Sequence, residues 1–194
     1  MGAFFSSLGR TITAGVVLLI IIVLAVGGLM EGGVLRGGDL FIVRWLHVMA
    51  GVMWIGLLWY FNFVQTPSMP KIPDEQKPAV SKVIAPSALF WFRWSALATV
   101  VLGLLLAYMN HFLVQALMLN KGVHAIGIGM WLGLIMAFNV WFIIWPNQKK
   151  VMGLVTATPD EVNAARRIAG LTSRVNTMLS IPMLYAMASS HYFG

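Results

Sequence analysis

Hydrophobic and polar positions alternate along this chain in long blocks. Five mainly apolar stretches of about twenty residues or more are separated by shorter polar, Gly-rich or Pro-rich segments. Twenty residues of α-helix extend about 30 Å, which is the thickness of the hydrocarbon core of a bilayer. The pattern therefore predicts five transmembrane helices, at residues 11–30, 40–66, 86–110, 123–145 and 170–190.

The first apolar stretch, TITAGVVLLIIIVLAVGGLM, could also be read as a secretory signal peptide. The apolar core of a signal peptide is usually about 7–15 residues long and is followed by a small-residue cleavage site. This stretch has twenty uncharged residues, and no clean cleavage site follows it. We therefore interpret it as a transmembrane helix.

The second and fourth predicted helices contain a repeated segment. HVMAGVMWIGLLWYFN at residues 47–62 returns as HAIGIGMWLGLIMAFN at residues 124–139, with seven of sixteen positions identical. The repeat unit is a helical hairpin, and both copies have the same orientation, so their symmetry axis should run along the membrane normal. We expect an all-α integral membrane protein whose last four helices form a pseudo-twofold four-helix bundle of two tandem hairpins.

Composition supports a single membrane domain over residues 1–194. The chain is 59% hydrophobic and 10% charged, whereas a soluble domain carries about 25% charged residues. Within it we expect an additional first span and loop at residues 1–39, the first hairpin at 40–112 and the second at 113–194. Cysteine is absent, which excludes disulfides, thiolate metal sites and covalent haem attachment through CxxCH.

The net charge of +7 follows the predicted topology, so we expect a lipid bilayer and no nucleic acid as its partner. Lys and Arg mark the cytoplasmic side of membrane proteins. One predicted side carries Arg10, Lys71, Lys77, Lys82, Lys149, Lys150, Arg166, Arg167 and Arg174, and the other carries Arg36, Arg44 and Lys121. This distribution predicts a multi-pass protein of the bacterial inner membrane, with a cytoplasmic N-terminus and a periplasmic C-terminus.

Two histidines occupy matching places in the repeat. His47 and His124 each precede a tryptophan, Trp54 and Trp131, by seven residues, so each pair shares one helix face. A histidine inside a transmembrane span is a functional candidate because its burial in lipid is costly. Facing helices of a four-helix bundle commonly supply two histidines to a cofactor in the core.

A b-type haem held by His47 and His124 is the cofactor that this pattern favours. Gly51, one turn from His47, would let a flat macrocycle approach the helix backbone. Arg44 lies near the predicted outer surface and could pair with a haem propionate. Copper or another metal bound by imidazoles is the alternative.

The other two histidines, His111 and His191, fall at the outer ends of the third and fifth predicted helices. A histidine at such an end is more often a polar cap than a ligand, but both could join a site made by all four imidazoles. Depth above the inner lysines favours pairing His47 with His124. Pairing within a hairpin, such as His47 with His111, is the alternative.

Three polar residues in the spans have simpler interpretations. Asn62 and Asn139 recur near the inner ends of their helices, where they could hydrogen-bond across the bundle or form a polar site; we favour packing. Arg93 lies near the inner end of the third predicted helix, where it can extend to the interface.

The strings RWLHVMAGVMWIGLLWYFNFVQTP and FNVWFIIWPNQKKVMG resemble the membrane domain of bacterial membrane-bound urate hydroxylase of the PuuD type. The looser His-x6-Trp-x-Gly pattern is also similar to copper-resistance D proteins and to HemJ-type, haem-binding protoporphyrinogen oxidases. In the full-length urate enzymes a C-terminal cytochrome c follows. This sequence ends at Gly194 with no CxxCH, so we expect the cytochrome c domain to be lacking.

The resemblance implies redox work at a membrane, with electrons passing to or from a periplasmic cytochrome c. We therefore expect a b-type cytochrome-like membrane subunit of the urate hydroxylase family. The sequence does not decide whether this subunit is itself an oxidoreductase. The alternative is a non-catalytic accessory subunit of a larger respiratory or photosynthetic membrane complex.

Overall fold

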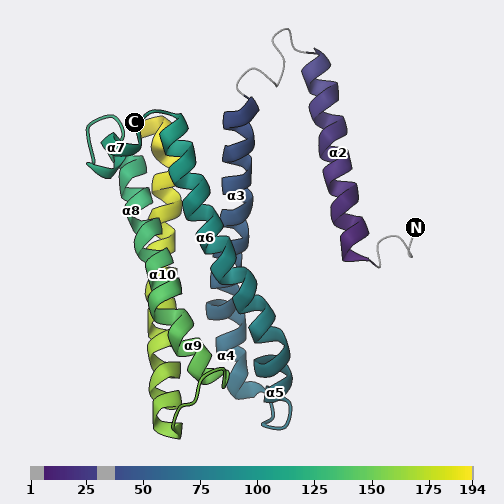
Figure 1. Cartoon of the computed structure of the whole chain (residues 1–194), viewed down its shortest axis with the longest axis vertical. Helices are drawn as coiled ribbons and strands as arrows, with labels where there is room; N and C mark the ends of the chain where they lie inside the picture. Colours follow the sequence, from purple (N-terminus) through teal and green to yellow (C-terminus); the bar gives the residue numbers. More distant parts are fainter. Residues whose placement is uncertain (1–6, 30–37, 194) are drawn as a thin grey trace. The chain divides into compact units, whose positions relative to one another are not determined.

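The computed structural model describes the backbone of residues 7–29 and 38–193, and the side chains of residues 7–24 and 38–189. Arg36 and the side chain of His191, both used above, lie outside the described residues. All the regular elements in the described ranges are helices, which confirms the all-α fold (Figure 1).

The chain divides into two compact units, residues 1–42 and residues 43–194. The first unit contains α2 (Leu8–Leu29), a 22-residue helix that matches the first predicted span to within three residues. The second unit contains the bundle formed by the four other long helices, and it holds all the features discussed below.

Three continuous helical segments make up most of the bundle. The first runs through α3 (Gly38–Trp59), η1 (Tyr60–Gln65), α4 (Thr66–Ser68) and η2 (Met69–Lys71). The second runs through α5 (Lys77–Ala79), η3 (Val80–Ile84) and α6 (Ala85–Met109), and the third through α8 (His124–Phe138), η4 (Asn139–Ile144) and α9 (Trp145–Val151). Within the described residues, these three segments are long and apolar enough to cross a membrane. The chain is therefore an all-α membrane protein.

The last long helix, α10 (Pro159–Phe193), is 35 residues long. It begins eleven residues before the fifth span predicted at 170–190, and no break in the helix marks residue 170. Its first half carries arginines and its second half is apolar. The total of five spans, which includes α2 and α10, stays a prediction.

Thr158 caps the start of α10. Its hydroxyl accepts a hydrogen bond from the Glu161 N–H at 3.3 Å, and its own N–H donates to the Glu161 carboxylate at 2.8 Å. This reciprocal pair is a capping box. The hydrogen bonds from Thr158 lower the pKa of Glu161, because they stabilise the carboxylate form. The capping box therefore fixes the start of α10 at Thr158-Pro-Asp-Glu.

Three π-helical turns interrupt the long segments, and each one precedes a proline. The prolines Pro67, Pro86 and Pro146 stand two residues after the ends of η1, η3 and η4. Proline lacks an N–H and its ring clashes with the carbonyl four residues earlier, so the preceding turn of a helix must widen or kink. The wider turns keep these helices continuous, and such turns are frequent at functional sites.

The core of the bundle is formed by all four long helical segments. Its buried apolar residues are Trp54, Ile55, Leu58, Leu89, Phe92, Ala96, Met136, Ala137, Val140, Ile144 and Met183. α10 packs along α8, η4 and α9, and α6 contacts α8 and η4. Among the described residues this arrangement leaves a hollow towards each end of the bundle.

Hydrogen bonds from the repeated asparagines tie the helices to α10. The side-chain amide of Asn62 donates to the Ser173 hydroxyl at 2.8 Å, and that of Asn139 donates to Asn176 Oδ1 at 2.8 Å. Asn176 is fully buried and donates in turn to the carbonyl of Met136 at 2.9 Å. The interpretation of Asn62 and Asn139 as residues that hydrogen-bond across the bundle is confirmed.

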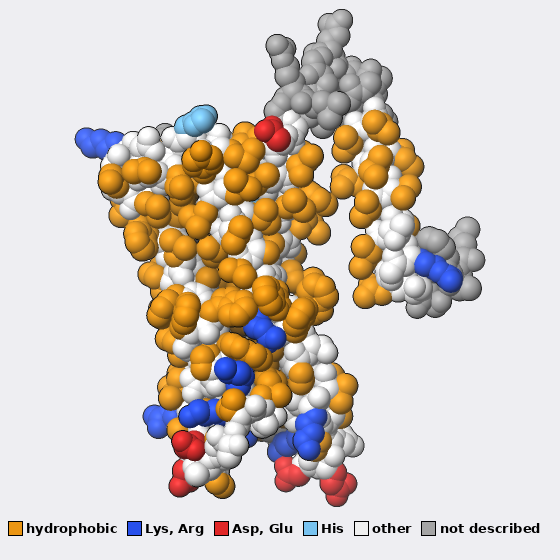
Figure 2. All heavy atoms as spheres, viewed as in Figure 1, with side chains coloured by type: hydrophobic (Ala, Val, Ile, Leu, Met, Phe, Trp, Pro, Cys, Tyr) orange, Lys and Arg blue, Asp and Glu red, His pale blue; other side chains and the backbone are white. Residues whose placement is uncertain are grey.

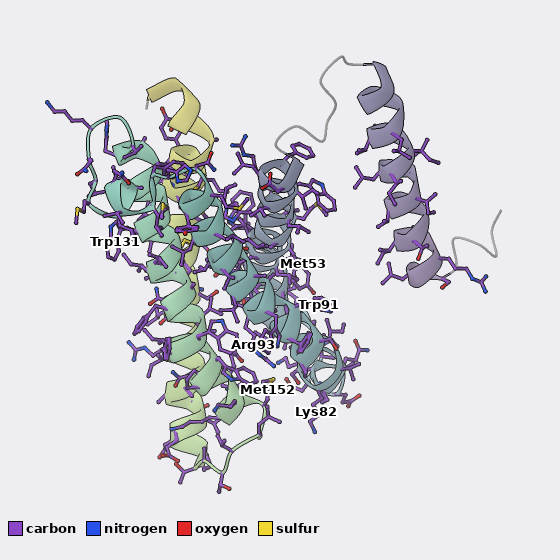
Figure 3. All side chains as sticks on the ribbon, turned by 45° about the horizontal axis from the view of Figure 1, so that its top comes forward. Met53, Lys82, Trp91, Arg93, Trp131 and Met152 are labelled. Carbon is purple, nitrogen blue, oxygen red and sulfur yellow. The ribbon has the colours of Figure 1, made fainter. Side chains whose placement is uncertain are left out.

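Lys and Arg side chains gather at the end of the bundle where η2, α9 and the first half of α10 lie, which we call the basic end (Figure 2). Arg93 of α6, on the way to this end, stacks its guanidinium 3.7 Å from the ring centroid of Trp145 (Figure 3). A cation over an indole face is stabilised by the ring quadrupole. Arg93 therefore has an aromatic partner in α9 as well as a route to the interface.

Candidate functional site

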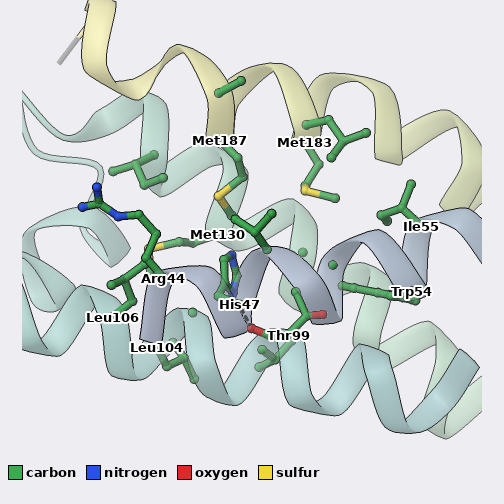
Figure 4. Close-up of a pocket in the computed structure, with 18 of the residues that line it drawn as sticks. Arg44, His47, Trp54, Ile55, Thr99, Leu104, Leu106, Met130, Met183 and Met187 are labelled. Carbon is green, nitrogen blue, oxygen red and sulfur yellow. Dashed lines mark hydrogen bonds between the residues drawn. The ribbon is translucent and has the colours of Figure 1, made fainter. Parts of the chain in front are cut away.

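The larger hollow, which we call the His47 cavity, lies among α3, α6, α8 and α10 in the half of the bundle away from the basic end (Figure 4). Its volume is about 770 Å³, within the range typical of small-molecule and cofactor sites. Most of its wall is apolar, and three methionines contribute: Met130, Met183 and Met187.

His47 is half-buried on α3 and lines this cavity. Its Nδ1 lies 2.9 Å from the backbone carbonyl of Thr99 on α6. A carbonyl can only accept a hydrogen bond, so Nδ1 carries the proton in this contact and Nε2 of the neutral ring keeps its lone pair. Histidines that bind metals are commonly oriented by such a contact to a backbone carbonyl.

Gly103, one turn after Thr99, makes room for the imidazole. A Cβ atom at this position would lie 2.8 Å from His47 Cε1, closer than real Cβ atoms approach, and 3.1 Å from Nδ1, which is a tight contact. The same Cβ would be 3.8 Å from Nε2, so Nε2 is the ring nitrogen farther from α6. Gly103 could not be identified from the sequence, because its place beside His47 depends on how α3 and α6 are aligned.

The other site residues predicted in the first repeat line the same cavity. Arg44 is exposed, Gly51 is half-buried and Trp54 is 1% exposed. The indole N–H of Trp54 is buried and has no hydrogen-bond partner. A buried donor without an acceptor is unfavourable, so a ligand with an acceptor group near Trp54 would relieve this cost.

The matching residues of the second repeat do not line the cavity. His124 is exposed at the first turn of α8, and Trp131 is 46% exposed on the outer side of that helix (Figure 3). Trp131 donates its indole N–H to the carbonyl of Leu117 in α7 (Leu113–Leu117) at 3.0 Å. Gly127 on the same face meets the carbonyl of Ala116. The face of α8 that bears His124 therefore packs on α7, while Ile126 and Met130 point into the cavity.

The remaining histidines lie at helix ends. His111 is exposed, and its φ of 60° places it in the left-handed region just after α6, where a residue commonly ends a helix. His191 falls in the last turn of α10, and its side chain is not among those described. Among the described side chains, no group of three or more His, Cys, Asp or Glu residues could hold a metal ion. The pairing of His47 with His124, and a site of four imidazoles, stay predictions that these positions do not favour.

The second hollow, which we call the basic pocket, lies at the basic end and has a volume of about 350 Å³. The three π-helical segments meet there: Phe61, Asn62 and Gln65 of η1, the last residue of η4, and Ala85 directly after η3 all line it. α10 closes the pocket with arginines and a serine, and α9 contributes Gln148. In the sequence these arginines indicate only the topology, and nothing in it places them in a site.

The family model described as Urate oxidase N-terminal matches residues 110–193. This range covers less than half of the chain and contains α7, α8, η4, α9 and α10. Searches among curated proteins and among solved structures gave no match.

The match bears on the resemblance described above. It contains the string FNVWFIIWPNQKKVMG of the second hairpin, and it does not reach the first string, which includes His47. The second hairpin is therefore similar to the N-terminal region of urate oxidases. The similarity covers residues 110–193 and leaves α3 and α6 outside it.

Proposed function

We propose that this chain is a membrane redox protein of the urate hydroxylase type, in which the His47 cavity holds a b-type haem. The observation that carries the proposal is the contact of His47 Nδ1 with the Thr99 carbonyl, which leaves Nε2 as a potential metal ligand in an apolar cavity. The haem would supply one-electron transfer.

The residues around the cavity fit such a group. Arg44, near the end of the cavity away from the basic end, could pair with a propionate. Gly51 and Gly103 keep the walls beside His47 free of side chains. A methionine of the wall, such as Met130, would help His47 to hold the haem, whereas His124 does not line the cavity.

The similarity of residues 110–193 to urate oxidases supports urate or a related purine as the reductant. A periplasmic cytochrome c would then exchange electrons with the cavity from the end at which Arg44 lies. The chain itself would bind the substrate, orient the cofactor through His47 and keep water out of the apolar cavity.

A visible spectrum of the purified protein tests the cofactor directly. We expect a Soret band and, after treatment with pyridine and dithionite, the spectrum of a b-type haem, at about one haem for each chain. A haem precursor added during expression ensures that the cells make enough haem to fill the protein. A protein that stays colourless under these conditions, while melting cooperatively, would contradict the proposal.

The orientation in the membrane follows from the basic end. Because Lys and Arg are retained on the cytoplasmic side, we propose that this end, with Lys77 and Lys149, faces the cytoplasm of a bacterial inner membrane. The chain has no cysteine, so a thiol reagent labels single-cysteine variants only at the introduced position. A cysteine at Lys77 should react with a membrane-impermeant maleimide only after the cells are opened, and one at Lys121 should react in intact spheroplasts. The reverse pattern would show the opposite orientation.

A further inference from the structure

We propose that the basic pocket binds a small planar organic anion whose ring carries carbonyl and N–H groups. The inference rests on the proposed function for the choice of an oxidised purine as the probe. The site itself is inferred from charge, shape and unsatisfied hydrogen bonding at the basic end.

The charge of the pocket comes from α10. Arg167 and Arg174 are seven residues apart and so share one helix face, and both line the pocket. Neither makes an ion pair or side-chain hydrogen bond within the described residues, and no acidic residue lines the pocket. Gly170 lies between them, and a Cβ there would meet nothing within 4 Å, so the space between the two arginines is open.

The other lining residues of the pocket suit a flat ring with polar edges. Phe61 and Phe92 line the pocket with their rings edge to face, 5.7 Å apart between centroids. Gln65 and Gln148 add amide groups, which can both donate and accept hydrogen bonds. A phosphate group would use the arginines alone, whereas a ring with alternating carbonyl and N–H groups would use the amides and the aromatic face as well.

Gln65 gives independent evidence of a missing partner. Its side-chain oxygen is buried and has no hydrogen-bond partner. Gln65 is the last residue of η1, where the π-helical turn that precedes Pro67 sets its position. The side-chain amide of its neighbour Asn62 already donates hydrogen bonds to the Ser173 hydroxyl and to the carbonyl of Leu58. Asn62 therefore fixes the position of this wall of the pocket, and the Gln65 oxygen is available to accept a hydrogen bond from a ligand N–H.

Urate fits this description, because it is a planar monoanion at neutral pH with several carbonyl and N–H groups. Equilibrium dialysis of the purified full chain in neutral-lipid nanodiscs should show saturable binding of urate. Arg174→Gln and Gln65→Leu should each weaken binding by about tenfold or more, because each removes a partner of a buried or charged group. The matched control Lys71→Gln removes one charge from the same end outside the pocket and should leave the dissociation constant unchanged.

Several outcomes would overturn the proposal. Equal weakening by Lys71→Gln would show that urate is attracted only by the general charge of the basic end. Displacement of urate by inorganic phosphate at similar concentrations, or loss of binding in nanodiscs containing phosphatidylglycerol, would assign the pocket to a phosphate headgroup. Unchanged binding in Arg174→Gln and Gln65→Leu would place urate elsewhere.

The haem and the pocket can fail separately. His47→Ala should remove the Soret band without changing urate binding, because the two sites share no lining residue. If urate binds but no haem is found, the basic pocket stands as a urate site and the proposed haem is contradicted. If haem is found but urate does not bind, the proposed haem stands and the urate site is contradicted.

Discussion

Replacement of His47 by alanine is expected to abolish haem binding, while His124→Ala should retain nearly all of it. His47 lines the cavity and is oriented by the Thr99 carbonyl, whereas His124 is exposed on a face that packs on α7. The measurement is the Soret absorbance for each unit of purified protein, with the pyridine spectrum as a check on haem content.

Rescue by free imidazole separates a lost ligand from a damaged fold. His47→Ala leaves a hole of imidazole size beside Gly103, so imidazole added to the variant with haem should restore the Soret band. His111→Ala serves as a second control, since His111 is exposed after the end of α6. Loss of haem in His124→Ala together with its retention in His47→Ala would contradict the site described here.

The lengths of the apolar stretches predicted the helices of the bundle well, because hydrophobic length alone defines a membrane-spanning segment. Four of the residues proposed for the site, Arg44, His47, Gly51 and Trp54, do line one cavity. Their spacing of three, four and three residues keeps them on one face of α3. Helical periodicity alone is enough to predict that residues with this spacing lie together.

The repeat could not show that its second copy faces a different neighbour. Residues 113–117, between the third and fourth predicted spans, form α7, which packs beside α8 at Gly127 and accepts the hydrogen bond from Trp131. That packing depends on small residues meeting across the two helices, Ala116 against Gly127, and these are common in any membrane helix. Equal sequence positions therefore have unequal surroundings.

The basic pocket could not be predicted for a related reason. Arginines near the end of a membrane helix usually mark orientation, and nothing in their spacing separates that role from ligand binding. The prolines that follow η1, η3 and η4 were visible in the sequence, but only the fold brings the three widened turns to one place.

The second large effect expected is on stability, at Gly127. A Cβ atom there would lie 2.1 Å from the carbonyl oxygen of Ala116 and 2.9 Å from Leu119 Cδ2. Backbone cannot move aside as a flexible side chain can, so Gly127→Ala should separate α7 from α8 and weaken the hydrogen bond from Trp131 to Leu117. Overpacking of this kind costs about 1–3 kcal/mol. We expect thermal unfolding in detergent, followed by circular dichroism, to shift down by several degrees.

Gly133→Ala in the same helix is the matched control. Gly133 lines the His47 cavity, and a Cβ there meets nothing within 4 Å, so this substitution adds a methyl group to open space, and the two variants are compared in haem-free protein. Alanine is favoured over glycine in a helix by about 1 kcal/mol, and the melting temperature should stay the same or rise. If Gly127→Ala melted no lower than Gly133→Ala, α7 would not be packed against α8 as described. The orientation of His124 away from the cavity would then not be explained by packing of α7 on α8.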